Sequence, residues 1–322
     1  MNRAPLLLFI KITSTLFNVS TEKIKVAVIY GGSSSEREVS LNSGKNIIKY
    51  LPRDKYEVVP LEVAIDGTWA FNDLSQFDVV FIGLHGTYGE DGQIQAGLDE
   101  QGVKYTGSGA VASKLAFNKY LSSQTVSKAG LQIPKQQLIT NPTELTMQPP
   151  FVVKPNNNGS SVAVTIVTKQ SQIKKALNKA FAVDKEVLIE EYITGRELTC
   201  GILGDQPLPS VEIIPTGKFF DYEAKYNSPN TQEICPANIG PEIERLVQKK
   251  SLQAHQILGC HGLTRSDFIL DKNNNLFYLE TNTLPGLTDA SLCPKEAKAA
   301  GINFSDFLDR QIELALQNKS KR

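Results

Sequence analysis

Residues 265–291 read RSDFILDKNNNLFYLETNTLPGLTDAS. Two apolar runs rich in Phe, Ile and Tyr flank an Asn-rich tip at residues 273–275, and this pattern predicts a β-hairpin. Asp267 begins the first run, while Glu280 and Asn282 end the second, so the hairpin brings these side chains together. Glu280 and Asn282 are two residues apart and therefore face the same side of an extended strand. The stretch predicts a cluster of oxygen ligands at the open end of a hairpin.

Such a cluster suits Mg²⁺, which proteins usually bind through one or two carboxylates together with substrate phosphates. Arg265 lies two residues before Asp267, so it points to the same side and is placed to hold a phosphate or an oxyanion. A plain surface hairpin with solvated acids is the alternative. The segment TLPGLTDAS at residues 283–291 favours the metal site, because a Pro-Gly turn with Thr and Ser hydroxyls is typical of a loop around a polar ligand.

The composition is that of an ordinary globular protein. The 322 residues are 41% hydrophobic and 21% charged, a length that favours two or three domains. The formal net charge is zero, so no basic field points to nucleic acid. The four cysteines lie far apart without a CxxC motif, which favours reduced thiols in a cytoplasmic protein over a zinc site.

The first 22 residues are apolar but interrupted by Lys11. They form a poor signal peptide and are too short and broken for a membrane span. An upstream start codon and a genuine extension lying on the body of the protein are the alternatives. We expect an extension that takes no part in the chemistry, and no membrane partner.

A buried parallel strand is expected at residues 24–30, because IKVAVIY is a continuous apolar run. Gly31 and Gly32 follow, and a helix then runs to about residue 50, a Rossmann-like opening that places a ligand at the strand's carboxyl end. Glu36, in the first turn of that helix, has two interpretations: a ligand contact, or an acid favoured by the helix dipole. His85 follows another buried strand at residues 78–84, and we favour a ligand contact over a structural His.

A second nucleotide-binding signal is the turn NNNGSS at residues 156–161, between strands at residues 151–154 and 162–167. With Lys154 at its base, such a tip can fold over phosphates, although an ordinary flexible hairpin has the same pattern. Residues 216–232 lack periodicity, as in a lid or binding loop. The other expected elements are strands at residues 56–63, 186–193 and 198–203, one helix carrying both Lys114 and Lys119, and helices at residues 94–101, 172–181, 242–258 and 302–316.

Several blocks in a fixed order resemble the D-alanine:D-alanine ligases of the ATP-grasp superfamily. They are GGSSSEREVSLNSG, LHGTYGEDGQIQ, YTGSG, FVVKPNNNGSSV, DYEAKY, RSDF and LETNTLPGLTDASL, which together span nearly all of residues 24–316. The resemblance implies an α/β fold: a three-domain ATP-grasp ligase with a Rossmann-like N-terminal domain at residues 24–107, a central subdomain at 108–189 and a C-terminal subdomain at 190–322. Residues 1–23 form the extension.

The resemblance also implies a reaction. The carboxylate of one D-alanine attacks the γ-phosphate of ATP, and the amine of a second D-alanine then displaces phosphate from the acyl phosphate. Two Mg²⁺ ions, with Mn²⁺ as a substitute, would neutralise the phosphate charge. The product is a dipeptide of peptidoglycan synthesis, and the family implies a homodimer.

The site residues that the resemblance implies fall into groups. The metal ligands are Asp267, Glu280 and Asn282, of which Glu280 bridges both ions. Phosphates are held by Lys119 and Lys154, adenine by Glu190 and by the backbone of Glu191, Tyr192 and Ile193, and ribose by Glu197. The oxyanion stabilisers are Arg265 and the N–H of Gly286. The first substrate is held by Glu36 with His85 nearby, and the second by Ser291, Lys225 and Leu292. The hydrogen-bonded trio that closes the lid is Ser160, Tyr226 and Glu36.

Tyr226 favours D-alanine as the second substrate, because the D-lactate branch of the family departs from tyrosine here. A ligase with D-serine or D-lactate as second substrate is the alternative. Departures from the family pattern are NNNGSSVA in the phosphate loop, Phe219–Phe220 in the lid and the N-terminal extension. Two other classes of protein are alternatives. A nucleotide-binding protein without catalysis predicts a lost metal ligand or a lost Arg265, and neither is seen. A dinucleotide oxidoreductase predicts a GxGxxG motif, which the first turn lacks.

Overall fold

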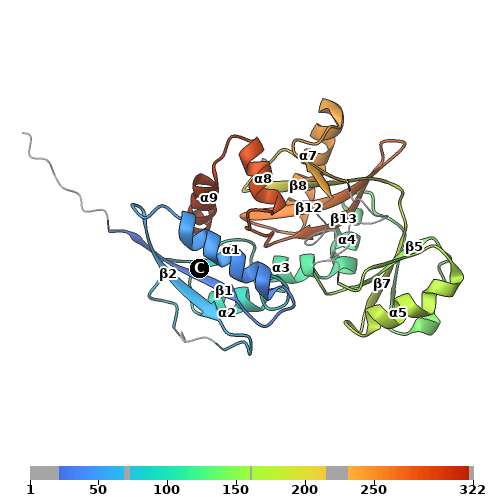
Figure 1. Ribbon diagram of the computed structural model, residues 1–322, viewed down its shortest axis with the longest axis horizontal. Helices are drawn as coiled ribbons and strands as arrows, with labels where there is room; N and C mark the ends of the chain where they lie inside the picture. The colour runs from blue at the N-terminus through green and yellow to red at the C-terminus, as the bar shows by residue number, and fades with distance from the viewer. Residues whose placement is uncertain (1–21, 69–72, 160–161, 215–230, 319–322) are drawn as a thin grey trace, which may run out of the picture.

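The computed structural model describes residues 22–68, 73–159, 162–214 and 231–318. In these ranges the strands form three sheets, which Figure 1 shows in separate regions of the molecule. The N-terminal extension up to residue 21 and nearly all of the expected lid, residues 215–230, lie outside the described residues. None of the helices in the described ranges is long and apolar enough to cross a membrane.

The first sheet is parallel, with the order β2-β1-β3. Strands β1 (Ile24–Gly31), β2 (Tyr56–Val63) and β3 (Val79–Ile82) match the expected apolar runs. Two glycines with left-handed backbone, Gly31 and Gly32, turn the chain into helix α1 (Arg37–Tyr50), which confirms the Rossmann-like opening. Glu36 is the N-cap residue of α1 and so stands just before the first turn in which we expected it. Helix α2 (Gln93–Glu100) follows β3.

The second sheet is antiparallel, with the order β4-β7-β5-β6. Its strands are β4 (Gln136–Ile139), β5 (Phe151–Pro155), β6 (Thr165–Val167) and β7 (Val187–Glu191). Helix α5 (Ile173–Phe181) covers it through its buried face of Ala176, Leu177 and Ala180, with short 3-10 turns at Pro142–Glu144 and Gln170–Gln172. Strand β7 runs across residues 189 and 190, between which the domain boundary is proposed.

The third sheet carries the hairpin, in the order β11-β10-β8-β12-β13 with β9 beside β8. Its strands are β8 (Gly195–Leu203), β9 (Gln206–Pro207), β10 (Val211–Ile214), β11 (Gln232–Ile234), β12 (Leu263–Asp271) and β13 (Leu276–Asn282). The helices that accompany it are α7 (Gly240–Ile257) and α8 (Leu292–Ala299). The final helix, α9 (Phe304–Gln317), instead lies against the first sheet, where Asp309 accepts hydrogen bonds from Lys55 and Tyr56.

One expected helix is wrong. The segment with Lys114 and Lys119 forms two helices, α3 (Ala110–Phe117) and α4 (Lys119–Lys128). Asn118 separates them because its backbone is extended and its side chain caps α4 by accepting from the N–H of Leu121 at 2.8 Å. The break turns Lys119 toward the second sheet, where its backbone N–H bonds the carbonyl of Asn156.

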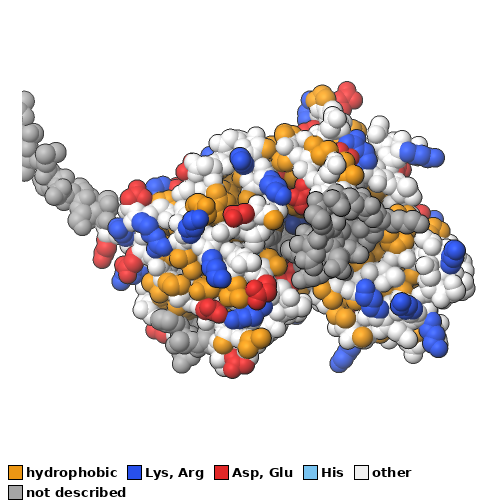
Figure 2. All heavy atoms as spheres, in the orientation of Figure 1, with side chains coloured by type: hydrophobic (Ala, Val, Ile, Leu, Met, Phe, Trp, Pro, Cys, Tyr) orange, Lys and Arg blue, Asp and Glu red, His pale blue; other side chains and the backbone are white. Residues whose placement is uncertain are grey.

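The hydrophobic core joins the first sheet to the third. Val26 and Phe81 of the first sheet share one buried cluster with Leu263, Leu287 and residues of α9. The loop that follows the hairpin is therefore packed against α1, which places β13 next to the ligand edge of the first sheet. Figure 2 shows Lys, Arg and acidic side chains interspersed over the lobe of the first sheet, which fits the zero formal net charge.

Candidate active site

The hairpin is confirmed, and its register places the expected metal ligands side by side. Asp267 lies opposite Glu280, and Arg265 opposite Asn282, with a bulge after Asp267. The Asn-rich tip folds because Asp271 accepts hydrogen bonds from the N–H groups of Asn273 and Asn275, each at 2.8 Å. Local turn chemistry therefore sets the register that brings the acids together.

Asp267 is held from two sides. Arg265 donates through Nε and Nη2 to its two carboxylate oxygens, each at 2.8 Å, and Thr199 Oγ1 donates to Oδ1 at 2.6 Å. Asp267 is only 7% exposed. Burial lowers the pKa of Arg265, but the charge of Asp267 outweighs it and holds that pKa well above its usual range. Arg265 is therefore a fixed cation, with its orientation set by the acid beside it.

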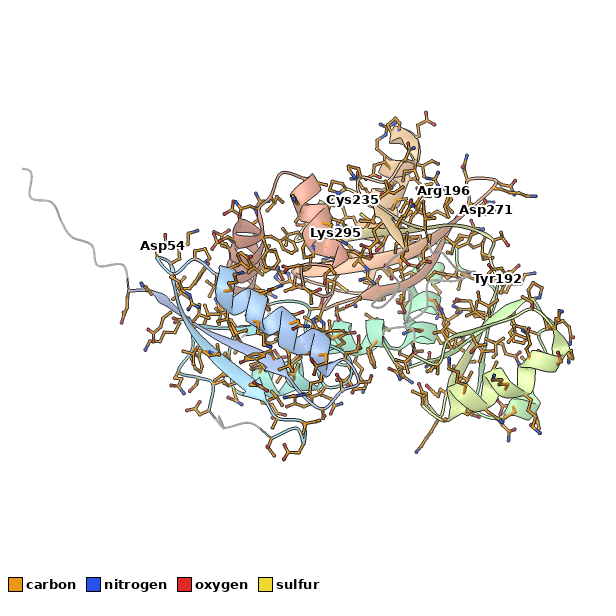
Figure 3. All side chains as sticks on the ribbon, in the orientation of Figure 1. Asp54, Tyr192, Arg196, Cys235, Asp271 and Lys295 are labelled. Atoms are coloured by element: carbon orange, nitrogen blue, oxygen red, sulfur yellow. The ribbon has the colours of Figure 1, made fainter. Side chains whose placement is uncertain are left out.

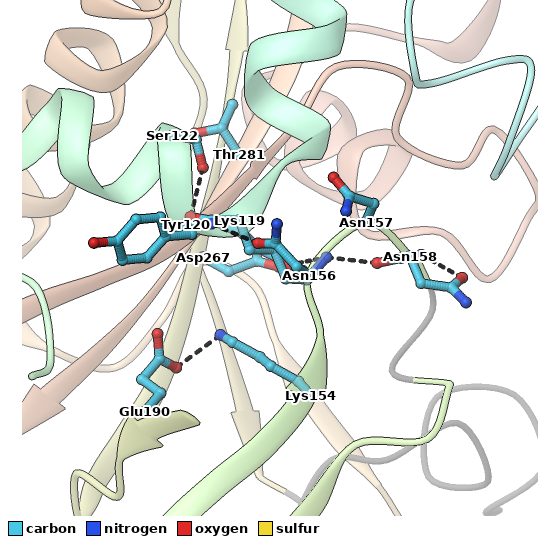
Figure 4. Close-up of polar contacts among 12 residues, drawn as sticks. Lys119, Tyr120, Ser122, Lys154, Asn156, Asn157, Asn158, Glu190, Asp267 and Thr281 are labelled. Carbon is cyan, nitrogen blue, oxygen red and sulfur yellow. Dashed lines mark hydrogen bonds and ion pairs between the residues drawn. The ribbon is translucent and has the colours of Figure 1, made fainter. Parts of the chain in front are cut away.

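Two lysines converge on the same region (Figure 4). Lys119 Nζ lies 3.2 Å from Glu280 and also donates to the backbone carbonyl of Asn158 at 2.5 Å. Lys154 Nζ is buried and lies 2.7 Å from Glu190. Each lysine is therefore paired directly with an acid.

Two adjoining cavities meet at the hairpin. The larger, of about 340 Å³, lies between the second and third sheets, in the size range of small-molecule sites. The smaller, of about 130 Å³, lies toward the first sheet. Lys119, Asp267 and Glu280 line both. The larger cavity is also lined by Lys154, Glu190, Glu191, Tyr192, Ile193 and Glu197, and the smaller by Glu36, His85, Glu197, Arg265, Asn282, Gly286, Ser291 and Leu292.

The described residues of the expected nucleotide site therefore line one cavity, and those of the expected substrate site the other. Figure 3 shows Tyr192 at the junction between the lobe with β5 and β7 and the sheet with β12 and β13. Arg196, at the edge of the larger cavity, is held by two 2.6 Å hydrogen bonds to Glu212, which shape that wall.

Glu36 is 6% exposed and is approached by two glycine-containing loops. A Cβ added at Gly86 would lie 2.8 Å from Glu36 Oε2, and one added at Gly159 would lie 2.6 Å from the same atom. The loop after β3 and the loop after β5 therefore both meet this carboxylate, although they are far apart in sequence. The carboxylate remains at the wall of the smaller cavity.

Gly159→Ala is expected to lower kcat/KM about tenfold, because the added methyl displaces the Glu36 carboxylate or the phosphate loop. The matched control is Gly97→Ala within α2, where a Cβ meets nothing within 4 Å and a helical Gly-to-Ala change is favourable. Steady-state phosphate release from ATP measures the effect. Equal activity of both variants would show that the approach to Glu36 is unimportant.

The Gly286–Ser291 turn forms the far wall of the smaller cavity. Ser291 is the N-cap residue of α8, and its Oγ accepts from the N–H of Thr288 at 3.0 Å and contacts Thr288 Oγ1 at 2.8 Å. A Cβ at Gly286 would lie 2.7 Å from Ser291 Oγ, so only glycine leaves room for this hydroxyl. The turn thus presents a backbone N–H and a hydroxyl on one wall.

Glu296 is a buried acid that sequence analysis missed. It is 0% exposed on α8, and its Oε1 accepts from the N–H of Gly201, the residue opposite Arg265 in the β8–β12 pairing. A Cβ at Gly201 would lie 2.4 Å from Glu296 Oε2, so the glycine makes the space for the carboxyl. Burial raises the pKa of Glu296 to about 8, although the charge of Arg265 opposes this. No local pattern marks Glu296, because its neighbours come from distant strands.

Glu296→Gln is expected to increase the free energy of unfolding near pH 8 but not near pH 4. The raised pKa means that the folded state keeps a proton which the unfolded chain loses above pH 4.5, so wild-type stability falls between pH 4.5 and about 8, by up to about 1.4 kcal/mol per pH unit. The neutral amide does not ionise and avoids this loss. Urea unfolding of both proteins across this range measures it. Parallel stability curves would contradict the burial argument.

Ser160, Lys225 and Tyr226 lie outside the described residues. The expected metal ligands, two carboxylates and an amide oxygen on facing strands, are hard ligands of the kind that Mg²⁺ prefers. No group of three or more His, Cys, Asp or Glu suited to a metal occurs within the described ranges, so the remaining ligands would come from phosphate and water. The residues present therefore fit Mg²⁺.

The family models described as D-ala D-ala ligase N-terminus and C-terminus match residues 25–76 with 71–108, and residues 119–313. The D-alanine--D-alanine ligase of Syntrophobacter fumaroxidans is 43% identical over 312 residues, covering 93% of this chain and 100% of that protein. The VanG D-Ala:D-Ser ligase from Enterococcus faecalis matches with a TM-score of 0.83 and 29% identity, covering 91% of this chain and 100% of that one.

A second structure, D-alanine--D-alanine ligase from Bacillus anthracis complexed with ATP, has a TM-score of 0.79 and 32% identity, covering 93% of this chain and 99% of that one. The likeness thus extends over both cavities and the hairpin between them. The family models together also span all three sheets. The chain therefore belongs to the D-alanine–D-alanine ligase family and has its α/β ATP-grasp fold.

Proposed function

We propose that the protein joins two D-alanine molecules to D-alanyl-D-alanine at the expense of ATP, as a step in peptidoglycan precursor synthesis. The observation that carries the proposal is the position of Asp267 and Glu280, which face each other and line both adjoining cavities. A nucleotide in the larger cavity and an amino acid in the smaller one would meet at these acids. Such a junction suits transfer of a phosphoryl group from one ligand to the other.

ATP binds in the larger cavity in this proposal. Lys119 and Lys154 hold its phosphates, and Glu197 holds the ribose. The purine lies against Glu190 and the backbone of residues 191–193, which offers a donor and an acceptor at the base edge. Two observations support these assignments: all of these residues line the larger cavity, and Lys154 is buried beside Glu190.

The first D-alanine lies in the smaller cavity, with its ammonium near Glu36 and with His85 on the wall beside it. One oxygen of its carboxylate attacks the γ-phosphorus of ATP, the bond to the bridging oxygen breaks, and ADP leaves with that electron pair. The product is D-alanyl phosphate, in which phosphate is a good leaving group. Closure over this intermediate would involve Ser160 and Tyr226, which keeps water away.

The second D-alanine attacks the acyl carbon through its free amine. Negative charge develops on the carbonyl oxygen, where Arg265 and the N–H of Gly286 stabilise it. Collapse of the tetrahedral intermediate expels phosphate, and the amine loses a proton to give the peptide bond. This second substrate is held by Ser291, Lys225 and Leu292. The position of Ser291 on the wall of the smaller cavity supports this assignment.

Asp267, Glu280 and Asn282 would hold two Mg²⁺ ions, or Mn²⁺ in their place. Metal bound there supplies positive charge against the β- and γ-phosphates. Until phosphates and metal arrive, Arg265 and Lys119 provide that charge to the two acids.

A cytoplasmic location and a homodimer complete the proposal. Cys200, Cys235, Cys260 and Cys293 are all free thiols, as expected in a reducing compartment that also contains ATP. The homodimer is supported by the resemblance to the family. Light scattering at micromolar concentration tests it, with a mass near 35.4 kDa as the contradictory result.

Phosphate release from ATP with Mg²⁺ tests the proposed function. D-alanine, D-lactate, D-serine and L-alanine are offered in turn, and the last three are also paired with D-alanine. Release with D-alanine alone, with the dipeptide identified by mass, is the expected result. Release only with a mixed pair would move the function to a depsipeptide or D-alanyl-D-serine ligase, and no release despite ATP binding would overturn catalysis.

A further inference from the structure

Ser43, on the inner face of α1, joins two loops of the smaller cavity. Its side chain is 0% exposed. Its Oγ accepts from the N–H of Leu287 at 3.2 Å and lies 2.9 Å from Nε2 of His85. A single hydroxyl therefore connects the loop after β3 to the turn after β13, although these are about 200 residues apart in sequence.

The second nitrogen of His85 is also engaged. Nδ1 lies 3.0 Å from the carbonyl oxygen of Leu284, and Oε1 of Glu90 lies 3.7 Å from the same nitrogen. A carbonyl oxygen only accepts, so Nδ1 carries the proton. In the neutral ring Nε2 then has no proton and only accepts, so the hydroxyl proton of Ser43 points to Nε2 while its oxygen accepts from the N–H of Leu287. The chain of donors runs from Leu287 through Ser43 and His85 to Leu284.

This chain begins and ends in the same turn. Leu284 and Leu287 flank Pro285 and Gly286, so the relay clamps both sides of Gly286. One helical turn along α1, Asn46 Nδ2 donates to the carbonyl of Leu287 at 3.2 Å, so both backbone polar groups of Leu287 are bonded to side chains of α1. Helix α1 thus fixes the backbone on which the N–H of Gly286 is carried.

We propose that Ser43 is a positioning residue for the ligase reaction, acting through His85 and the Leu284–Leu287 turn to hold the N–H of Gly286 in place for the oxyanion. His85 serves as a strut in this arrangement, since both its ring nitrogens are committed to protein groups. The inference rests on the proposed function only for the role of Gly286. The hydrogen-bond order itself is independent of any reaction.

Ser43→Ala is expected to lower kcat about tenfold while leaving KM for ATP unchanged, because the larger cavity does not involve α1. Ser251→Ala is the matched control, a fully buried helical serine on α7 away from the cavities. Asn46→Ala, at a less buried contact, is expected to give a smaller fall in kcat and serves if Ser43→Ala does not fold. Wild-type kcat in folded Ser43→Ala, or in Asn46→Ala where Ser43→Ala does not fold, would overturn the proposal.

Nitrogen chemical shifts of the imidazoles in wild-type protein labelled at histidine give a readout that needs no activity. The chain has only three histidines, so the His85 signals can be assigned by substitution. At a pH at which the ring is neutral, the expected result is a proton on Nδ1, which is the minor form of free histidine. Protonation on Nε2 alone would reverse the relay and overturn the proposal. If the wild-type protein did not ligate D-alanine, the proposed function would be wrong, while the position of the His85 proton would still test the hydrogen-bond relay.

Discussion

Glu280→Gln is expected to lower kcat by roughly a thousandfold and to leave the fold intact. The amide has the same volume as the carboxylate but carries no charge, so metal affinity and charge neutralisation at the junction of the two cavities are lost. The ion pair with Lys119 is lost as well. Because Glu280 is 29% exposed in that pair, it contributes at most about 1 kcal/mol to stability.

Phosphate release at saturating ATP and D-alanine measures this effect, with thermal unfolding as the check on the fold. Glu57→Gln is the control, since Glu57 is an exposed acid on β2 away from either cavity. Wild-type turnover by the Glu280 variant would overturn the assignment of Glu280 as a metal ligand. An equal loss of kcat in both variants would mean that the assay responds to the loss of any negative charge and not to Glu280 in particular.

Arg265→Met is expected to lower kcat by about two to three orders of magnitude, because the fixed cation beside the acyl carbon is lost. It also removes both hydrogen bonds that Arg265 donates to Asp267, so the buried carboxylate loses its cationic partner and keeps the hydrogen bond from Thr199. A loss of about 3 kcal/mol in the free energy of unfolding is expected from that unpaired charge in the absence of Mg²⁺.

Adding Mg²⁺ and ATP is expected to recover much of the lost stability but none of the lost kcat, because metal can replace the charge near Asp267 and not the guanidinium near the acyl carbon. Arg265→Lys keeps a charge without the two-point geometry and is expected to fall between wild type and Arg265→Met. The control is Arg310→Met on the exposed face of α9. Normal kcat in Arg265→Met would remove Arg265 from the second step.

The hairpin could be predicted because its information is local. Asp271 and the asparagines that follow it specify the tip, and strand alternation then places Glu280 beside Asp267. The first sheet was equally accessible, since β1 and β3 are continuous apolar runs ended by Gly and polar residues. Elements of this kind are determined by nearest neighbours in sequence.

The break at Asn118 was missed because the residues on both sides favour a helix, and the break depends on a tie between Lys119 and Asn156 in another sheet. The short strands β4, β10 and β11 and helix α8 were also missed, because three or four residues carry too little periodicity and α8 follows directly from a turn. These elements gain their stability from tertiary pairing.

The support behind the site could not be predicted either. Glu296 matters because Gly201 leaves space for it, and Ser43 matters because His85 and Leu287 meet at its hydroxyl. Their partners come from other elements, tens to hundreds of residues away, so no spacing in the sequence marks them. Family resemblance could identify residues that touch substrate, while the residues that hold them in place required the three-dimensional contacts.

Transfer of oxygen from D-alanine to phosphate tests the central claim most directly. D-alanine labelled with ¹⁸O in both carboxylate oxygens is incubated with the protein, Mg²⁺ and unlabelled ATP, and the phosphate and dipeptide are examined by mass spectrometry. If the carboxylate attacks the γ-phosphorus, each released phosphate contains one ¹⁸O and the new peptide carbonyl keeps the other. Dipeptide formed with unlabelled phosphate would contradict the acyl phosphate, and with it the account of the two cavities and the acids between them.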